Sequence, residues 1–271
     1  MNGPELLAQH EGVLRTRVGA CWPGTRAVFR GHDLHRDLHD CDWMELYIFG
    51  ITGRRHTPEQ VRLLHGLWVL TSYPDARIWN NRVAALAGSS RSTPVLGMSA
   101  ALAVSEARIY GGGPGLRAID FFLRAKKALA AGDTLRDFIL AELETRHIYG
   151  YGRPIDSCDE RLPWLAKLAG ELGQDQGPHL KIALEVEKIL LEMGKPNLRM
   201  NYAGMCAELG ADLGLSRREF HLFRVPMFIA GMSPCWLEAA EKPEGTLFPV
   251  PCDAIAYEGV AHREWPGKNI E

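Results

Sequence analysis

The sequence predicts a mostly α-helical protein. Apolar residues recur at helical spacing in several segments, helix-start signals precede four of them, and the alternating patterns typical of strands are scarce. Only residues 25–29 and 254–257 alternate well enough to suggest strands. A chain of 271 residues can form one large domain or two small ones, each with an ample core.

The first clear helix start lies at Thr57. Threonine is a favoured N-cap residue, Pro58 suits the first helical position, and Gln60 can complete a capping box. An apolar run follows to residue 70 and predicts that this helix is partly buried. Further along, the Ala-rich segment 100–108 predicts a short buried helix before a cluster of glycines.

Three further helices are predicted by their boundary residues. Thr134 precedes a segment with apolar residues at helical spacing, and Pro178 opens another that Gly194 ends. Ser216 and Glu219 stand three residues apart, as in a capping box, and predict a helix from residue 217. No internal repeat, low-complexity tract or long linker separates these segments.

Composition argues against several classes of partner. The net charge is −2 and no run of Lys or Arg exceeds two residues, so we expect neither a nucleic-acid surface nor an anionic-membrane surface. The N-terminus lacks a secretory signal pattern, and the apolar runs are too short to span a membrane. Six cysteines are scattered without a Cys-x-x-Cys pair, which favours reduced thiols in a cytoplasmic protein.

Two stretches carry most of the functional information. The first is Leu86-Ala-Gly-Ser-Ser-Arg-Ser-Thr-Pro94, which leads on to Ile109-Tyr-Gly-Gly-Gly113. The second is Tyr149-Gly-Tyr-Gly-Arg-Pro154, which leads on to Asp159-Glu-Arg161. Shorter elements around them are Phe29-Arg-Gly-His-Asp-Leu34, Trp43-Met-Glu45, Pro196-Asn197, Tyr202-Ala-Gly204 and Ser233-Pro-Cys-Trp236. In this order and spacing, the set resembles the signatures of the citrate synthase and citryl-CoA lyase superfamily.

The resemblance implies an all-α homodimer with a large helical domain and a smaller inserted helical domain. Glycine-containing segments at 111–115 and 194–204 are the natural hinges of this chain. We therefore expect residues 1–115 and 223–271 to form the large domain and residues 116–222 the small one. The resemblance further implies that the cleft between the domains binds a CoA thioester, without a metal, and closes over it.

The implied reaction is the formation or cleavage of a carbon–carbon bond at an acyl thioester, by a transferase or a lyase. In that family a carboxylate removes a proton next to the thioester carbonyl, and a neutral histidine donates a hydrogen bond to the enolate oxygen. A second histidine serves the acceptor carbonyl, and arginines hold the acceptor's carboxylates.

This chain differs from the family at the catalytic positions. Tyr110 stands where the family has the enolate-binding histidine, and Arg153 stands at the acceptor histidine. The base aspartate falls at Met200 or Asn201, neither of which accepts a proton at neutral pH. The resemblance thus assigns catalytic positions to Tyr110, Arg153 and Asn201, and Asp156 is one possible replacement for the base.

The same resemblance assigns binding roles to other residues. Arg161 is retained among the acceptor-binding arginines, and Arg199 adds a cation beside the missing aspartate. Ser72 falls near an upstream acceptor-binding histidine, and His147 is the histidine closest to the second stretch. For the CoA moiety, the expected contacts are Ser89, Ser90 and Arg91 in the first stretch.

Each candidate also has a purely structural interpretation. Tyr110 can simply pack its ring before the glycine turn, and Arg153 can form an ion pair with Asp156 or Asp159. Arg199 can be a solvated loop residue. The loss of both histidines and the aspartate also favours an alternative function, that of a non-catalytic dimer that binds or senses a ligand.

One histidine-rich segment suggests a metal at first sight. His32, His35 and His39 precede Cys41, and the second and third are spaced to share one helix face. The matching family segment carries no metal, so we interpret these side chains as solvated residues at helix ends. The sequence therefore predicts no metal site.

Overall fold

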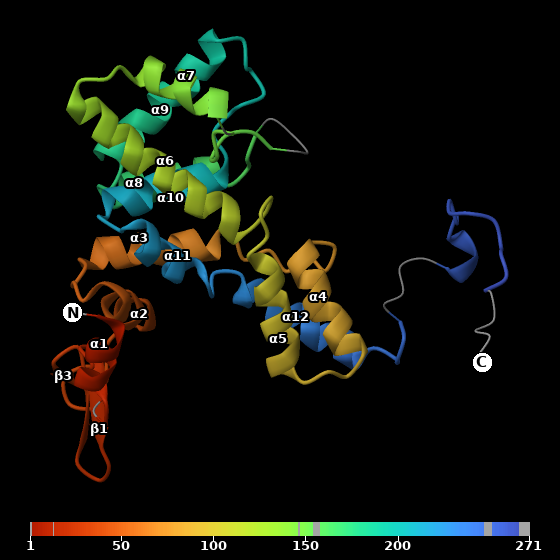
Figure 1. The fold of residues 1–271 in the computed structure, drawn as a ribbon, viewed down its shortest axis with the longest axis horizontal. Coiled ribbons are helices and arrows are strands. Elements are labelled where there is room, and N and C mark those ends of the chain that lie inside the picture. Colours follow the sequence, from red (N-terminus) through yellow and green to blue (C-terminus); the bar gives the residue numbers. More distant parts are fainter. Residues whose placement is uncertain (1, 13, 146, 154–157, 247–250, 266–271) are drawn as a thin grey trace.

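The structure is a computed structural model, which describes residues 2–12, 14–145, 147–153, 158–246 and 251–265. Helices dominate it, as the sequence predicts (Figure 1). They are α1 (Gly3–His10), α2 (Trp43–Thr52), α3 (Pro58–Val69), α4 (Trp79–Ser89), α5 (Pro94–Ser105), α6 (Gly112–Ala131), α7 (Leu135–Thr145), α8 (Leu162–Glu171), α9 (Pro178–Glu192), α10 (Tyr202–Asp212), α11 (Arg217–Arg224) and α12 (Ile229–Glu241).

A small antiparallel sheet accompanies the helices near the N-terminus. Strand β1 (Gly19–Trp22) pairs with β2 (Arg26–Phe29), and β2 pairs with the short β3 (His32–Asp33). The strand predicted at residues 25–29 is confirmed. The strand predicted at 254–257 is wrong: residue 254 ends the 3-10 turn η1 (Cys252–Ala254), and residues 255–257 are irregular because no neighbouring strand pairs with them in the described chain.

The capping residues act as the sequence predicts. The Thr57 hydroxyl accepts a hydrogen bond from the backbone N–H of Gln60, and the Gln60 side chain accepts one from Thr57. Ser216 and Glu219 form the same reciprocal pair at the start of α11. The Ala-rich segment belongs to the longer helix α5, because Thr93 caps α5 well before that segment.

The main hydrophobic core surrounds α10. This helix packs against α6 and α9, and the core extends to side chains of α2, α3, α7, α8 and α11. The largest fully buried side chains include Phe121, Phe122, Phe220, Phe223 and Leu63. Because α10 is buried on nearly every face, it holds the second motif against the centre of the molecule.

Helices α4, α5 and α12 form a second group beside this core (Figure 1). Gly88 of α4 permits the close approach of α12, since a Cβ there would overlap the backbone carbonyl of Trp236. The predicted domain boundaries at residues 115 and 223 remain a prediction. Within the described residues, none of the helices is both long and apolar enough to cross a bilayer.

Candidate functional site

The second motif is bonded directly to the segment that precedes α10. Tyr151 and Met200 form an isolated antiparallel bridge, and the Gly152 N–H donates to the Arg199 carbonyl at 2.6 Å. Gly150 and Gly152 have φ values of +98° and +83°, a left-handed conformation that favours glycine. Backbone hydrogen bonds therefore hold the segment of Arg153 beside Met200 and Asn201, where the family has its base aspartate.

Asn201 uses both ends of its amide to hold this arrangement. Its Oδ1 accepts from the Gly204 N–H at 3.1 Å and so caps α10, while its Nδ2 donates to the Gly152 carbonyl at 2.8 Å. A Cβ on Gly204 would overlap the Gly150 carbonyl, so the two segments lie in close backbone contact. Asn201 is therefore engaged in positioning the motif, and its amide offers no proton acceptor to a substrate.

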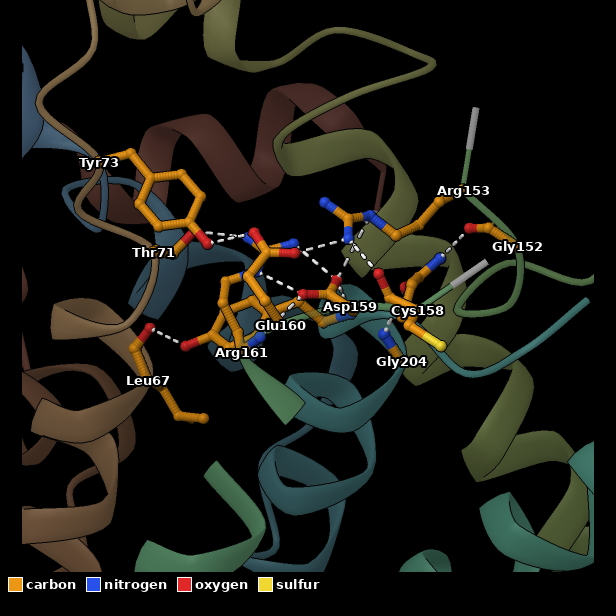
Figure 2. A network of polar contacts seen from close by, with 12 residues as sticks. Leu67, Thr71, Tyr73, Gly152, Arg153, Cys158, Asp159, Glu160, Arg161 and Gly204 are labelled. Carbon is orange, nitrogen blue, oxygen red and sulfur yellow. Dashed lines mark hydrogen bonds and ion pairs between the residues drawn. The ribbon is translucent and has the colours of Figure 1, made fainter. Parts of the chain in front are cut away.

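Arg161 forms one half of an arginine cluster (Figure 2). Its Nε and Nη2 donate to the two oxygens of Asp159 at 2.8 and 2.7 Å, a bidentate ion pair. Asp159 is buried and also accepts from the Tyr202 N–H at 2.9 Å, which ties the pair to α10. The Arg161 guanidinium lies 4.3 Å from the centroid of the Tyr202 ring, and its Nη1 is 3.4 Å from the Thr71 hydroxyl.

Arg153 forms the other half of the cluster. Its Nη1 donates to Glu160 Oε2 at 2.7 Å and to the Cys158 carbonyl at 2.6 Å, and its Nε is 3.9 Å from Asp159. The Tyr73 hydroxyl donates to the second oxygen of Glu160 at 2.7 Å (Figure 2). The two guanidinium groups therefore face two carboxylates from the chain itself, and the formal charges of the four side chains cancel.

The ionisation of these groups follows from their contacts. Hydrogen bonds from Tyr73 and Arg153 lower the pKa of Glu160 to about 2. Burial, together with the Glu160 contact, raises the pKa of Tyr73 to about 12. At Asp159 burial raises the pKa, but the hydrogen bonds and charge of Arg161 outweigh it, and the net pKa is lowered. Both carboxylates are thus ionised and the phenol is neutral at neutral pH.

An apolar cavity of about 590 Å³ lies beside this cluster, between α8, α9 and α10. Most of its lining is aliphatic. Asp159, Glu187, Arg199 and Met200 also line it, so it adjoins both the arginine cluster and the position of the missing aspartate. Arg199 itself is half-exposed and pairs with Glu187 at 3.1 Å. This cavity was not apparent in the sequence, because its walls come from three separate helices.

The remaining binding candidates of the second motif lie outside the cluster. The Ser72 hydroxyl donates to the Trp68 carbonyl at 2.7 Å and so completes the end of α3. Its neighbours Thr71 and Tyr73 do join the cluster. His147 is exposed, and Asp156 lies outside the described residues.

Tyr110 lies on the loop that joins α5 to α6. Its ring stacks on Trp79, with centroids 6.0 Å apart and planes at 29°, and 45% of its surface is exposed. Within the described residues its hydroxyl has no hydrogen-bond partner, and no polar or ring contact joins it to the arginine cluster. The next residue, Gly111, is the N-cap of α6 and has a φ of +65°. The phenol is thus accessible at the start of a long helix.

The CoA candidates Ser89, Ser90 and Arg91 lie at the far end of α4. Arg91 donates to backbone carbonyls at the end of α12, including that of Lys242 at 2.7 Å, and the Ser90 hydroxyl donates to the Ala87 carbonyl at 3.1 Å. These three residues line an open hollow of about 700 Å³. In this structure Arg91 therefore links α4 to α12.

Within the described ranges, no three His, Cys, Asp or Glu side chains converge as a metal site would require. The histidine-rich segment begins in β3 and continues through turns, so the expectation that it lies at helix ends is wrong: His32 packs edge-on against Phe49, and His39 is 3.3 Å from the Arg36 carbonyl.

Solved structures of known proteins share this helical arrangement. Citryl-CoA lyase from Hydrogenobacter thermophilus superposes with a TM-score of 0.82 and 19% identity, over 94% of this chain and 98% of that chain. The chain has the citrate synthase fold. ATP citrate lyase from Methanothrix soehngenii, solved with citrate and coenzyme A, matches with a TM-score of 0.69 and 19% identity, over 96% of this chain and 45% of that one.

Citrate synthase from Thermoplasma acidophilum shows the same citrate synthase fold, with a TM-score of 0.65 and 17% identity over 84% of this chain and 60% of that chain. No protein-family model and no curated protein sequence matches the chain. The resemblance in the motifs is therefore confirmed at the level of the fold.

Sequence reasoning missed several members of the cluster, among them Tyr73 and Glu160. Glu160 lies inside the recognised Asp-x-Arg element, but its charge alone does not reveal that it faces Arg153. Tyr73 is 87 residues away from Glu160 in the chain, and only the fold brings the two together. No periodicity or spacing in the sequence connects them.

Proposed function

We propose that this protein binds a CoA thioester in a cleft between its two helical domains and forms or cleaves a carbon–carbon bond beside the thioester carbonyl. The observation that carries the proposal is the near full-length structural match to citryl-CoA lyase. The proposed cleft is bounded by residues 1–115 and 223–271 on one side and 116–222 on the other.

In this proposal Tyr110 takes the part of the enolate-binding histidine. A phenol donates a hydrogen bond to a developing oxyanion, and the exposure of Tyr110 at the start of α6 leaves its hydroxyl available for one. Arg153 and Arg161 hold an anionic end of the acceptor, which at Arg153 has to compete with the carboxylate of Glu160. The apolar cavity beside Asp159 is large enough for an acyl chain or the apolar arm of the thioester.

The expected test of this role is a turnover assay on the wild-type protein and Tyr110→Phe. Acetyl-CoA with a panel of 2-oxo acids, and citryl-CoA alone, are incubated with each, and products are identified by mass spectrometry. The phenyl ring keeps the stack on Trp79 but removes the hydroxyl, so we expect the rate to fall about 100-fold. Equal rates for the two proteins would show that the Tyr110 hydroxyl takes no part in the reaction.

A second candidate function is that of a non-catalytic dimer that binds its ligand without turnover. The engagement of Asn201 by Gly152 and Gly204 favours it, because the amide at the base position is already used by the backbone. Saturable binding of a CoA ester, with no product from any substrate in the panel, would support this alternative.

The exposed face of α5 supports the proposed homodimer. This helix is apolar on nearly every face, its main contacts among the described helices are with α4 and α12, and Val95 and Leu96 are 74% and 62% exposed. We expect light scattering to give twice the mass of one chain, and Leu96→Asp to shift the protein towards the monomer. Full dimerisation of Leu96→Asp would place the interface elsewhere.

A further inference from the structure

We propose that Glu160 is a tethered carboxylate that occupies an anion-binding position between Arg153 and Tyr73, and that it excludes small di- and tricarboxylates from the cluster. This inference rests on the proposed function, because it concerns the ligand that the same cluster accepts. It adds a specificity-determining residue that the resemblance does not supply.

The geometry around Glu160 is that of a bound ligand carboxylate. Each of its oxygens accepts one strong hydrogen bond, from Arg153 Nη1 at 2.7 Å and from the Tyr73 hydroxyl at 2.7 Å. The two donors come from distant parts of the chain and converge on one anion (Figure 2). A free carboxylate that replaced Glu160 would find the same two donors with the same spacing.

The neighbouring carboxylate behaves differently. The Asp159 side chain is fully buried, pairs with Arg161 through both oxygens and accepts from the Tyr202 N–H, so it belongs to the scaffold. The Glu160 side chain is 61% exposed, and it contacts the cluster only through its tip. A carboxylate with this much solvent exposure gains little from its ion pair, so Glu160 is displaceable where Asp159 is not.

Arg153 explains why a displaced Glu160 leaves a binding site behind. Its side chain is only 15% exposed, so water cannot fully solvate the guanidinium once its carboxylate is removed. Among the described residues, its Nη1 then keeps only the Cys158 carbonyl, and Asp159 stays 3.9 Å from its Nε, so the guanidinium has a donor free for another carboxylate. Because hydrogen bonds from Tyr73 and Arg153 lower the pKa of Glu160 to about 2, acidification in the physiological range does not neutralise the tethered group. Glu160 therefore leaves its place between Arg153 and Tyr73 only when another ligand displaces it or when the residue is substituted.

The test is a calorimetric titration of wild type, Glu160→Ala and Glu160→Gln with succinate, citrate and, separately, acetyl-CoA. We expect Glu160→Ala to bind citrate or succinate at least about tenfold more tightly than wild type, and Arg153→Ala in the Glu160→Ala background to abolish the gain. Glu192→Gln is the matched control, because Glu192 forms an exposed ion pair with Arg136 elsewhere and its loss removes the same charge. Thermal unfolding verifies that each variant is folded.

The outcomes separate the inference from the proposed function. If wild type binds acetyl-CoA and Glu160→Ala gains no affinity for either carboxylate, the inference is overturned and the proposed function stands. If Glu160→Ala gains carboxylate affinity and no variant binds acetyl-CoA, the inference stands and the proposed function fails. An equal gain in Glu192→Gln would show a general charge effect and would also overturn the inference.

Discussion

Replacing Glu208 with glutamine is expected to remove one contribution to the pH dependence of the unfolding free energy, a loss of stability of about 4 kcal/mol between about pH 5 and 8. Glu208 lies on α10 with 0% of its surface exposed, and among the residues that the structure describes neither of its carboxyl oxygens has a hydrogen-bond partner. Burial, with a further contribution from Asp212, raises its pKa from 4.5 to about 9. The folded protein therefore keeps a proton on Glu208 that the unfolded chain releases above pH 4.5.

The sign of the effect follows from that difference in bound protons. Above the unfolded pKa the folded state binds one more proton, so stability falls as the pH rises, by about 1.4 kcal/mol per pH unit until the folded pKa is reached. Glutamine is neutral at every pH, so the variant does not lose stability in this way as the pH rises. Glu208→Gln should thus match wild type near pH 5 and exceed it by about 4 kcal/mol near pH 8.

Urea unfolding of both proteins at several pH values measures this difference directly. Other titrating groups are common to the two proteins and cancel in the comparison. Parallel stability curves from pH 5 to 8 would mean that Glu208 is ionised in the folded protein, with a partner or water that neutralises the cost of its burial.

Replacing Asp159 with asparagine is expected to destabilise the protein by about 3–5 kcal/mol. The substitution keeps the size of the side chain but leaves the guanidinium of Arg161 without its bidentate anion. Breaking one half of a buried ion pair is costly because the remaining charge stays desolvated. Asp159 has a lowered pKa, so its contribution is present at neutral pH and is lost as the pH falls through that value.

The adjacent carboxylate provides the matched control. Glu160→Gln removes the same charge one residue away, but the Glu160 side chain is 61% exposed, so its loss should change stability by no more than about 1 kcal/mol. Urea unfolding at pH 7 compares the two variants. Equal losses for both would contradict the division of the cluster into a structural carboxylate and a displaceable one.

The sequence predicted α3, α7, α9 and α11, whose starts carry boundary residues and whose faces differ in polarity. Thr57 and Ser216 mark α3 and α11 because a hydroxyl bonded to the first turn is a local signal. Helix α10 has a capping residue, Asn201, but no amphipathic face that would mark the residues after it as a helix. It is buried on nearly all sides and contains Gly204 and Gly210, so it shows neither amphipathic spacing nor high helix propensity.

The candidate site was predictable only where it lies in the motifs. Arg153 and Arg161 were identified by their place in the second stretch, and the structure brings them to one cluster. Their partners were not predictable, because a charge in the sequence does not reveal which charge it faces. The structure contains the ion pair of Arg153 with Asp159 that the structural interpretation expected. Arg153 also has a closer ion pair, with Glu160, which the sequence did not reveal.

A calorimetric titration of the wild-type protein with acetyl-CoA tests the central claim most directly. The proposed function predicts saturable binding with one ligand per chain, and the binding should weaken when Tyr110 or Arg153 is replaced by alanine. No saturable binding of acetyl-CoA by the folded protein would contradict the claim, and it would mean that this chain has kept the citrate synthase fold for a ligand other than a CoA thioester.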